Sequence, residues 1–237
     1  MSILGKFSKP RFILAYVLAP ALFLTAHTTD AGLRIGIVIA ALGELIRIWA
    51  NGYVGHVKVN QTDRASGRAK IGQLITAGPY AFVRHPLYFG SFLLGAGFCM
   101  MVGNLWLTGL ALVAFLVIYR KKMAEEEASI QAEWGPEGEA YHRRVPQWLP
   151  TLRRYPNRRG QWSWQGITAS QEWKTLVWVV VLAIALYLRK ESLQEHRLFQ
   201  ADRWRQHAAL LGVAALLMAA DGIFELMKRT KHARVEV

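Results

Sequence analysis

Six apolar runs, separated by polar segments rich in Lys and Arg, constrain the fold of this chain most. They cover residues 12–25, 33–50, 87–102, 105–119, 173–188 and 208–220. The chain is 53% hydrophobic and yet carries a formal net charge of +13, a combination that is rare in soluble domains. Multi-span membrane proteins combine the two because their charges concentrate in short loops. We therefore predict an all-α, multi-span transmembrane protein with about five to six spans.

The distribution of basic residues predicts which loops face the cytoplasm. Lys and Arg are retained on the cytoplasmic side of membrane proteins, so we expect the N-terminus and the loops 51–86 and 120–171 there. Counting spans places the loop 190–205 on the other side despite its Lys and Arg residues, and its orientation stays open. Nucleic-acid binding is disfavoured because the basic residues flank apolar runs instead of gathering in one polar domain. No cleavable signal peptide is expected.

The stretch Gly78–Gly90 is aromatic, basic and rich in turn residues, and it leads into an apolar run. Pro86 suits the first turn of a helix, where its missing N–H costs nothing. It also pushes His85 out of the α region. Arg84 and His85 are therefore expected at a helix entrance, beside free N–H groups and the positive end of the helix dipole. Ionisable groups at a membrane boundary usually serve function, pairing or topology, and we interpret this entrance as a candidate site.

A helical hairpin is predicted to bring a second group of charges to this entrance. Gly103-Asn104 marks a tight turn between the runs 87–102 and 105–119. The second helix can continue through residues 120–127, which contain no helix breaker. In that case Lys122, Glu126 and Glu127 return to the Arg84-His85 entrance, and the four-residue spacing puts Lys122 and Glu126 on one helix face.

These groups together could hold both a cation and an anion. The Tyr80 and Tyr88 rings and a carboxylate suit a cation, including a sulfonium ion. A guanidinium or an ammonium group suits a carboxylate or a phosphate. Spacing alone leaves two interpretations open, namely a cofactor and acceptor site, or interfacial ion pairs that only hold the loops together.

The remaining candidate residues point to no other chemistry. Glu44 and Arg47 lie three residues apart, so they either contact a bound headgroup or, as we slightly favour, neutralise each other near the membrane edge. Cys99 is interpreted as a buried small hydrophobe. His56 and His142 are interpreted as isolated and solvated, and no His/Cys spacing suggests a metal site.

Two blocks of the sequence resemble one enzyme family. Residues 78–88 resemble the signature of the isoprenylcysteine carboxyl methyltransferase family and its phospholipid N-methyltransferase relatives. A second block also matches, in the right order and at the right separation. It comprises Glu126, Glu127, Ala128, Ser129, Ile130, Trp134, Gly135, Glu139, Tyr141, Val145 and Pro146. The resemblance covers about residues 50–150.

The resemblance implies a membrane methyltransferase that uses S-adenosylmethionine. Its acceptor would be a lipid headgroup, a prenylcysteine-type carboxylate or a small lipophilic molecule at the cytoplasmic face. The implied cofactor contacts are Gln73, Leu74, Ile75, Tyr80, His85, Pro86, Tyr88 and Glu126. Arg84 and Lys122 would bind the acceptor, with Lys122 standing where the family has an arginine. Arg84, His85 and Glu127 would be catalytic, with Glu127 or His85 as the base where the acceptor needs one.

The predicted organisation has three parts and two functional alternatives. A transmembrane hairpin (1–52) precedes the methyltransferase core (53–150), in which cytoplasmic interfacial helices form the cofactor pocket, and a C-terminal extension (151–237) adds two apolar helices. The expected partners are a lipophilic substrate and membrane lipids. A transporter or scaffold would explain the spans but not the two blocks. An NADPH-dependent membrane reductase of the sterol-reductase type would resemble the helical core. The acceptor and the oligomeric state stay open.

Overall fold

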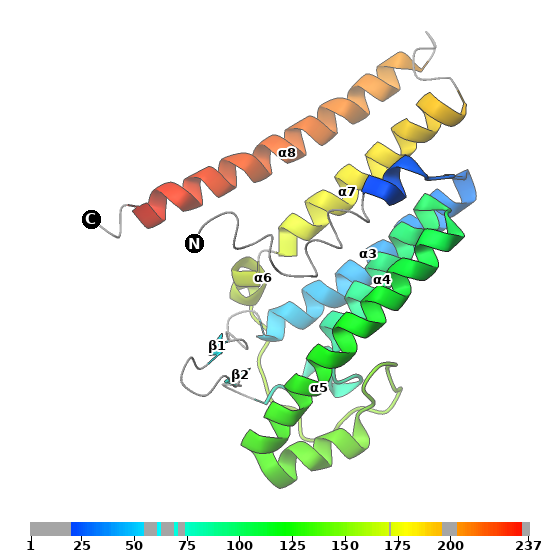
Figure 1. Cartoon of the computed structure of the whole chain (residues 1–237). Helices are drawn as coiled ribbons and strands as arrows, with labels where there is room; N and C mark the ends of the chain where they lie inside the picture. The colour runs from blue at the N-terminus through cyan, green and yellow to red at the C-terminus, as the bar shows by residue number, and fades with distance from the viewer. Residues whose placement is uncertain are drawn as a thin grey trace.

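The computed structural model describes residues 20–54, 61–62, 69–70, 74–170, 172–195 and 203–233, and these are mainly helical (Figure 1). The elements are α3 (Asp30–Val54), β1 (Gln61–Thr62), β2 (Ala69–Lys70), η1 (Gly78–Ala81), α4 (Pro86–Val102), α5 (Leu105–Arg144), α6 (Trp164–Ser170), α7 (Glu172–Arg189), η2 (Lys190–Gln194) and α8 (Trp204–Ala233). The two short strands pair antiparallel, with Gln61 opposite Lys70. The predicted helical class is confirmed, and this two-residue ladder is the one addition among the described residues.

The predicted hairpin of α4 and α5 is confirmed. Gly103 closes α4 in the left-handed conformation, with φ of 69°, and its N–H donates to the Cys99 carbonyl. The side chain of Asn104 then accepts from the Leu107 N–H and caps α5. As expected, α5 continues through residues 120–127, and it bends only at Gly135, where φ is 46° and Pro136 follows.

Small residues set the distance between α3 and α4, which pack antiparallel. A Cβ atom on Gly36 would lie 2.5 Å from the Gly97 carbonyl oxygen, and one on Gly97 would lie 2.5 Å from that of Gly36. Gly43 and Gly90 form a second reciprocal pair, at 2.6 and 2.7 Å. Such close backbone approach is typical of helices that pack inside membranes.

Ion pairs and hydrogen bonds attach the end of α7 and the following η2 to residues 24–30, and α8 to α7. At one end of α7, Arg189 donates to the carbonyl oxygens of Ala26 and Leu24, each at 2.6 Å. Close by, Lys190 Nζ lies 2.7 Å from Asp30 Oδ1. Lys174 of α7 pairs with Glu225 of α8 at 2.7 Å. Figure 1 shows α8 running alongside α7.

The two polar segments that were expected to share a face are hydrogen-bonded to each other. The Arg84 N–H donates to the Pro146 carbonyl at 2.9 Å, and the Thr151 N–H donates to the Phe82 carbonyl at 2.9 Å. The N–H groups of Thr76 and Ala77 both donate to the Arg159 carbonyl at 3.0 Å. A buried cluster of Leu74, Ala81, Tyr141, Val145 and Tyr155 fills the space between them. The two motif blocks therefore belong to one packed unit.

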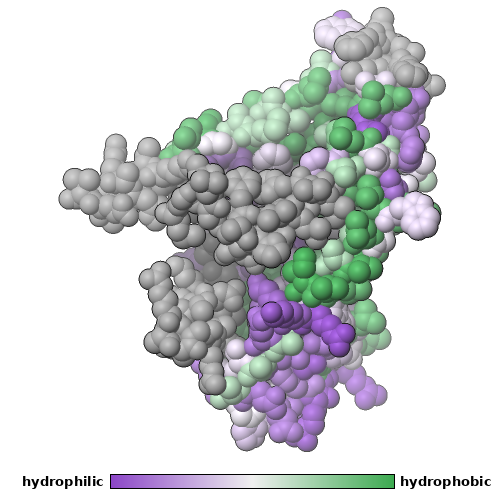
Figure 2. All heavy atoms as spheres, in the orientation of Figure 1, coloured by the Kyte–Doolittle hydropathy of each residue, from purple (hydrophilic) through white to green (hydrophobic). Residues whose placement is uncertain are grey.

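The surface separates into an apolar and a polar part. Large apolar side chains are exposed on several helices, including Trp106 (91%) on α5 and Leu216 (73%) on α8. In Figure 2 hydrophobic atoms gather over the helices, and hydrophilic atoms gather around the far end of α5. Among the described residues, Trp204–Met227 of α8 is the one segment long and apolar enough to cross a membrane, and Pro86–Val102 is apolar but shorter. The larger number of spans stays a prediction, and residues 12–19 of the first apolar run lie outside the described residues.

Candidate functional site

A cavity of about 390 Å³ lies where α3, the entrance of α4, the middle of α5 and the start of α7 meet. Its volume is at the lower end of the roughly 300–1,000 Å³ of small-molecule sites. It is lined by Arg47, Asn51, Val54, Leu74, Ile75, Tyr80, Arg84, His85, Pro86, Leu87, Tyr88, Ser91, Tyr119, Lys122, Glu126, Ile130, Tyr141, Ser170 and Glu172.

The entrance of α4 has the local structure that its sequence predicts. Pro86 is the first residue of α4, and His85 precedes it with φ of −121° and ψ of 64°, outside the helical region. The His85 side chain is buried, and its Nε2 lies 3.1 Å from Glu127 Oε1. Arg84 Nη1 lies 3.3 Å from the same carboxylate oxygen. Glu127 therefore ties the α4 entrance to α5.

The charges around Glu127 favour its ionised form. Burial alone would raise the pKa of this carboxyl, but the hydrogen bond with His85 and the positive charge of Arg84 together hold it below its usual value. His142 lies in the same surroundings, where burial and the charge of Arg84 lower its pKa. Among the described residues, its buried Nε2 has no hydrogen-bond partner. The prediction of a solvated His142 is therefore wrong, and His56 lies outside the described residues.

Aromatic rings and a second carboxylate form the adjoining wall. The Tyr88 hydroxyl donates to Glu126, and the Tyr88 ring lies 5.0 Å from the Tyr119 ring, centroid to centroid. Lys122 Nζ lies 5.9 Å from the centroid of Tyr88. A carboxylate beside aromatic faces is an arrangement that attracts a cation.

The structure brings together nearly all the residues that the sequence predicted for the site. Those that line the cavity are Leu74, Ile75, Tyr80, Arg84, His85, Pro86, Tyr88, Lys122 and Glu126. Glu127 does not line it, but it contacts His85 and Arg84, which do. Gln73 lies outside the described residues.

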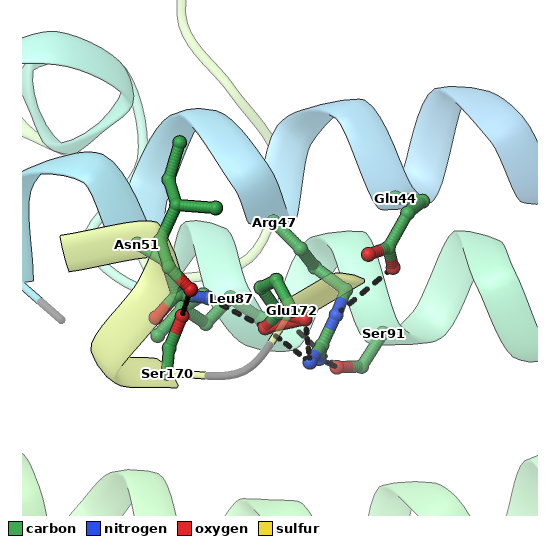
Figure 3. A network of polar contacts seen from close by, with 8 residues as sticks. Glu44, Arg47, Asn51, Leu87, Ser91, Ser170 and Glu172 are labelled. Atoms are coloured by element: carbon green, nitrogen blue, oxygen red, sulfur yellow. Dashed lines mark hydrogen bonds and ion pairs between the residues drawn. The ribbon is translucent and has the colours of Figure 1, made fainter. Parts of the chain in front are cut away.

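A second polar cluster in the cavity was missed from the sequence. Arg47 Nη2 donates to Glu172 Oε1 at 2.6 Å and to Oε2 at 3.0 Å (Figure 3). Glu44 Oε2 does lie 3.4 Å from Arg47 Nε, as its spacing predicts, but Glu172 is the closer carboxylate. The sequence signal for Glu172 is weak, because an acidic residue in the first turn of a helix normally only complements the helix dipole.

Comparison with known proteins gives one family and several relatives. The model of the isoprenylcysteine carboxyl methyltransferase (ICMT) family matches residues 35–132. The cobalt-zinc-cadmium resistance protein CzcN of Cupriavidus metallidurans is 30% identical over 65% of this chain and 66% of its own length. The protein-S-isoprenylcysteine O-methyltransferase of Schizosaccharomyces pombe is 35% identical over 37% of each chain. A probable protein-S-isoprenylcysteine O-methyltransferase of Oryza sativa subsp. indica is 30% identical over 58% of this chain and 76% of its own length.

The matches cover part of each relative, so this chain spans about two thirds of CzcN and just over a third of the fission yeast enzyme. No solved structure matches the chain. Within the part of the chain that the structure describes, no group of three His, Cys, Asp or Glu residues is arranged to hold a metal ion.

Proposed function

Because the chain belongs to the isoprenylcysteine carboxyl methyltransferase family, we propose that it is an integral membrane methyltransferase that uses S-adenosylmethionine and methylates a lipophilic acceptor at the cytoplasmic face. The observation that carries this proposal is the cavity in which the two motif blocks meet. Tyr80, His85 and Tyr88 of the first block and Glu126 of the second line the same space.

The residues of this space suit the proposed cofactor. Glu126 and the ring of Tyr88 would stabilise a cationic group such as a sulfonium. Leu74, Ile75 and Pro86 offer apolar surface for a heterocycle. The residues that would hold S-adenosylmethionine are Gln73, Leu74, Ile75, Tyr80, His85, Pro86, Tyr88 and Glu126. When bound, the cofactor supplies an electrophilic methyl group.

The chain itself would contribute alignment, exclusion of water and control of one proton. Arg84 would orient the polar head of the acceptor, because its guanidinium lines the cavity and is held by Glu127. An acceptor carboxylate needs no base. A hydroxyl or an amine must lose a proton, and His85 Nε2 or Glu127 Oε1, which lie 3.1 Å apart, would take it.

The acceptor would reach the cavity from the bilayer. We propose five to six spans, with the loops 51–86 and 120–171 in the cytoplasm, so the α4 entrance would lie at the membrane surface. There an acceptor's tail can stay in hydrocarbon while its head reaches Arg84. Lys122 is a point charge where the family has a planar arginine fork, which favours a lipid headgroup or small lipophile over a prenylcysteine carboxylate.

The deciding experiment measures cofactor binding by calorimetry on purified protein in detergent. S-adenosylmethionine should bind, and Glu126→Gln should raise its dissociation constant about ten-fold or more, because a charge-assisted contact of roughly 1.5–3 kcal/mol is lost. Glu125→Gln, which removes the exposed neighbouring carboxylate, should leave the constant unchanged.

Three other results would count against the proposal or its site. Binding of NADPH instead would identify a reductase, and binding of neither molecule would favour a transporter or scaffold. An unchanged constant in Glu126→Gln would remove Glu126 from the cofactor site.

A further inference from the structure

One end of the cavity is polar although the side chains that make it polar belong to neither motif block. Its members are Arg47 and Asn51 of α3, Ser91 of α4 and Glu172 of α7 (Figure 3), and all four belong to the residues that line the cavity. We call these residues the Arg47–Glu172 cluster. Glu172 lies beyond residue 132, where the family match ends. The C-terminal extension therefore supplies part of the cavity wall.

Hydrogen bonds between three helices hold the cluster together. Arg47 makes two hydrogen bonds to Glu172, at 2.6 and 3.0 Å, and also donates to Ser91. Asn51 Nδ2 donates to Glu172 Oε1 at 2.6 Å. A buried ion pair needs such additional bonds to offset the hydration it loses. Sites that are fixed on helices also place a ligand more accurately than sites on loops.

The charges of this end disfavour an anionic ligand. The guanidinium of Arg47 lies between two carboxylates, since Glu44 Oε2 is 3.4 Å from its Nε and Glu172 is 2.6 Å from its Nη2. The other cations among the described lining residues, Arg84 and Lys122, lie at the motif end, beside Glu127 and Tyr88 respectively. A ligand carboxylate at the cluster would have to displace Glu172 from Arg47. It would then still face the negative charge of Glu172.

A hydrogen-bond donor fits the same place without such a conflict. The two oxygens of an ionised carboxylate offer about four acceptor positions. Arg47 and Asn51 together fill three of those on Glu172. Among the described residues none is shown at the fourth position, which is therefore left for a ligand N–H or O–H.

The cluster also lies deeper along the helices than the α4 entrance. At roughly 1.5 Å per residue, Ser91 is about 7 Å beyond Pro86 along α4, and Arg47 is about 10 Å before the end of α3. Arg84 and the cluster line the same cavity, so with the topology proposed above an acceptor whose head reaches Arg84 from the bilayer also faces the cluster.

We propose that the Arg47–Glu172 cluster recognises the polar head of the methyl acceptor, and that this head is a hydrogen-bond donor, an amine or a hydroxyl, and not a carboxylate. This inference rests on the proposed methyltransferase function. It makes Glu172, a residue of the C-terminal extension, a determinant of acceptor specificity.

The test uses two probes, dodecylamine and dodecanoate, which have the same number of carbon atoms and head groups of opposite charge. Their binding to the full chain in nanodiscs is measured against empty nanodiscs. The wild type should prefer dodecylamine. Glu172→Gln releases Arg47 to pair with a carboxylate and should shift the preference toward dodecanoate by about ten-fold or more. Glu172→Asp, which keeps the charge, should restore the preference for the amine.

The matched control is Lys190→Gln. It breaks the Lys190–Asp30 pair, which joins η2 to the start of α3 at the opposite end of α7 from Glu172, and neither residue lines the cavity. This variant should leave the preference between the probes unchanged. If Glu172→Gln weakened the binding of both probes equally, Glu172 would only hold α7 against α3, and the inference would be wrong.

The wild type alone can also overturn the inference, even if a variant fails to fold. Preference for dodecanoate, or binding of neither probe, would exclude the proposed acceptor site. Binding of S-adenosylmethionine, measured in parallel by calorimetry, separates the two proposals. A wild type that binds no S-adenosylmethionine but prefers the amine would refute the methyltransferase and leave the cluster as an amine-binding site. The reverse result would refute the cluster as the acceptor site and leave the methyltransferase standing.

Discussion

At the scale of single residues, the site depends on two neighbouring glutamates that share His85 and differ in their other partners. Glu126 accepts from the Tyr88 hydroxyl and lies 3.6 Å from His85 Nδ1, whereas Glu127 binds His85 Nε2 and Arg84. Successive residues on a helix point in different directions, so one acidic pair can serve the cavity wall and the α4 entrance at once. The side chains of the two motif blocks meet because residues 120–127 contain no helix breaker, and this contact could be predicted from the sequence.

We expect the stabilising contribution of Glu127 to disappear in acid. Its pKa in the folded protein lies below the usual value of 4.5. The contribution is therefore complete above pH 4.5 and is lost as the pH falls through the lowered folded pKa. Glu127→Gln should unfold at a lower temperature than the wild type near neutral pH, and the gap should close in acid. Thermal unfolding in detergent from neutral to acid pH measures the difference in unfolding temperature between the two proteins. A difference that does not change with pH would contradict the lowered pKa of Glu127.

The Arg47–Glu172 contact shows where residue-level prediction stops. Its two partners lie 125 positions apart in the sequence. Whether Glu172 faces Arg47 depends on how α7 packs against α3, and helical periodicity indicates a buried face without indicating which residue of another helix lies opposite. The sequence therefore suggested only the local partner of Arg47, Glu44, which lies on the same helix.

At the scale of elements, the contact between α3 and α4 holds the entrance in place. Two reciprocal glycine pairs, Gly36 with Gly97 and Gly43 with Gly90, bring the backbones together. Gly90 follows Pro86 on α4, so this packing positions the residues next to His85. The α4–α5 hairpin could be predicted from its turn residues, but the α3–α4 register could not, because glycine also occurs at helix positions that face open space.

Gly97→Ala should destabilise the protein, because the added Cβ would lie 2.5 Å from the Gly36 carbonyl oxygen, a backbone atom that cannot turn away. Overpacking of this kind costs about 1–3 kcal/mol. Gly95→Ala is the matched control on the same helix, since nothing lies within 4 Å of its added Cβ. It should be neutral or stabilising by up to about 1 kcal/mol. Unfolding in detergent compares the two, and equal stabilities would contradict the close α3–α4 packing.

At the scale of the whole molecule, the two ends of the helices differ in chemistry. The cavity, the α4 entrance and the hydrogen-bonded loops gather at one end. The other end holds the α4–α5 turn and a separate buried cluster that includes Lys190, Glu191 and His207. The hydropathy in Figure 2 changes in the same direction, from apolar helices to the polar end of α5. This polarity agrees with a protein that crosses a bilayer with its site at one surface.

This arrangement predicts that residues 105 and 158 lie on opposite sides of the membrane. Leu105 begins α5 and is 86% exposed, and Arg158 is exposed in the loop that binds Thr76 and Ala77. The 17 residues of α4 extend about 25 Å at roughly 1.5 Å per residue, which nearly matches the ~30 Å hydrocarbon core of a bilayer.

In a Cys99→Ser background, an impermeant maleimide should label Leu105→Cys and Arg158→Cys from opposite sides of oriented vesicles. Glu139→Cys, exposed beyond the bend of α5, should label from the same side as Arg158→Cys. If Leu105→Cys and Arg158→Cys react from one side, the hairpin lies along the surface, and an acceptor could not enter the cavity from the bilayer by the proposed route.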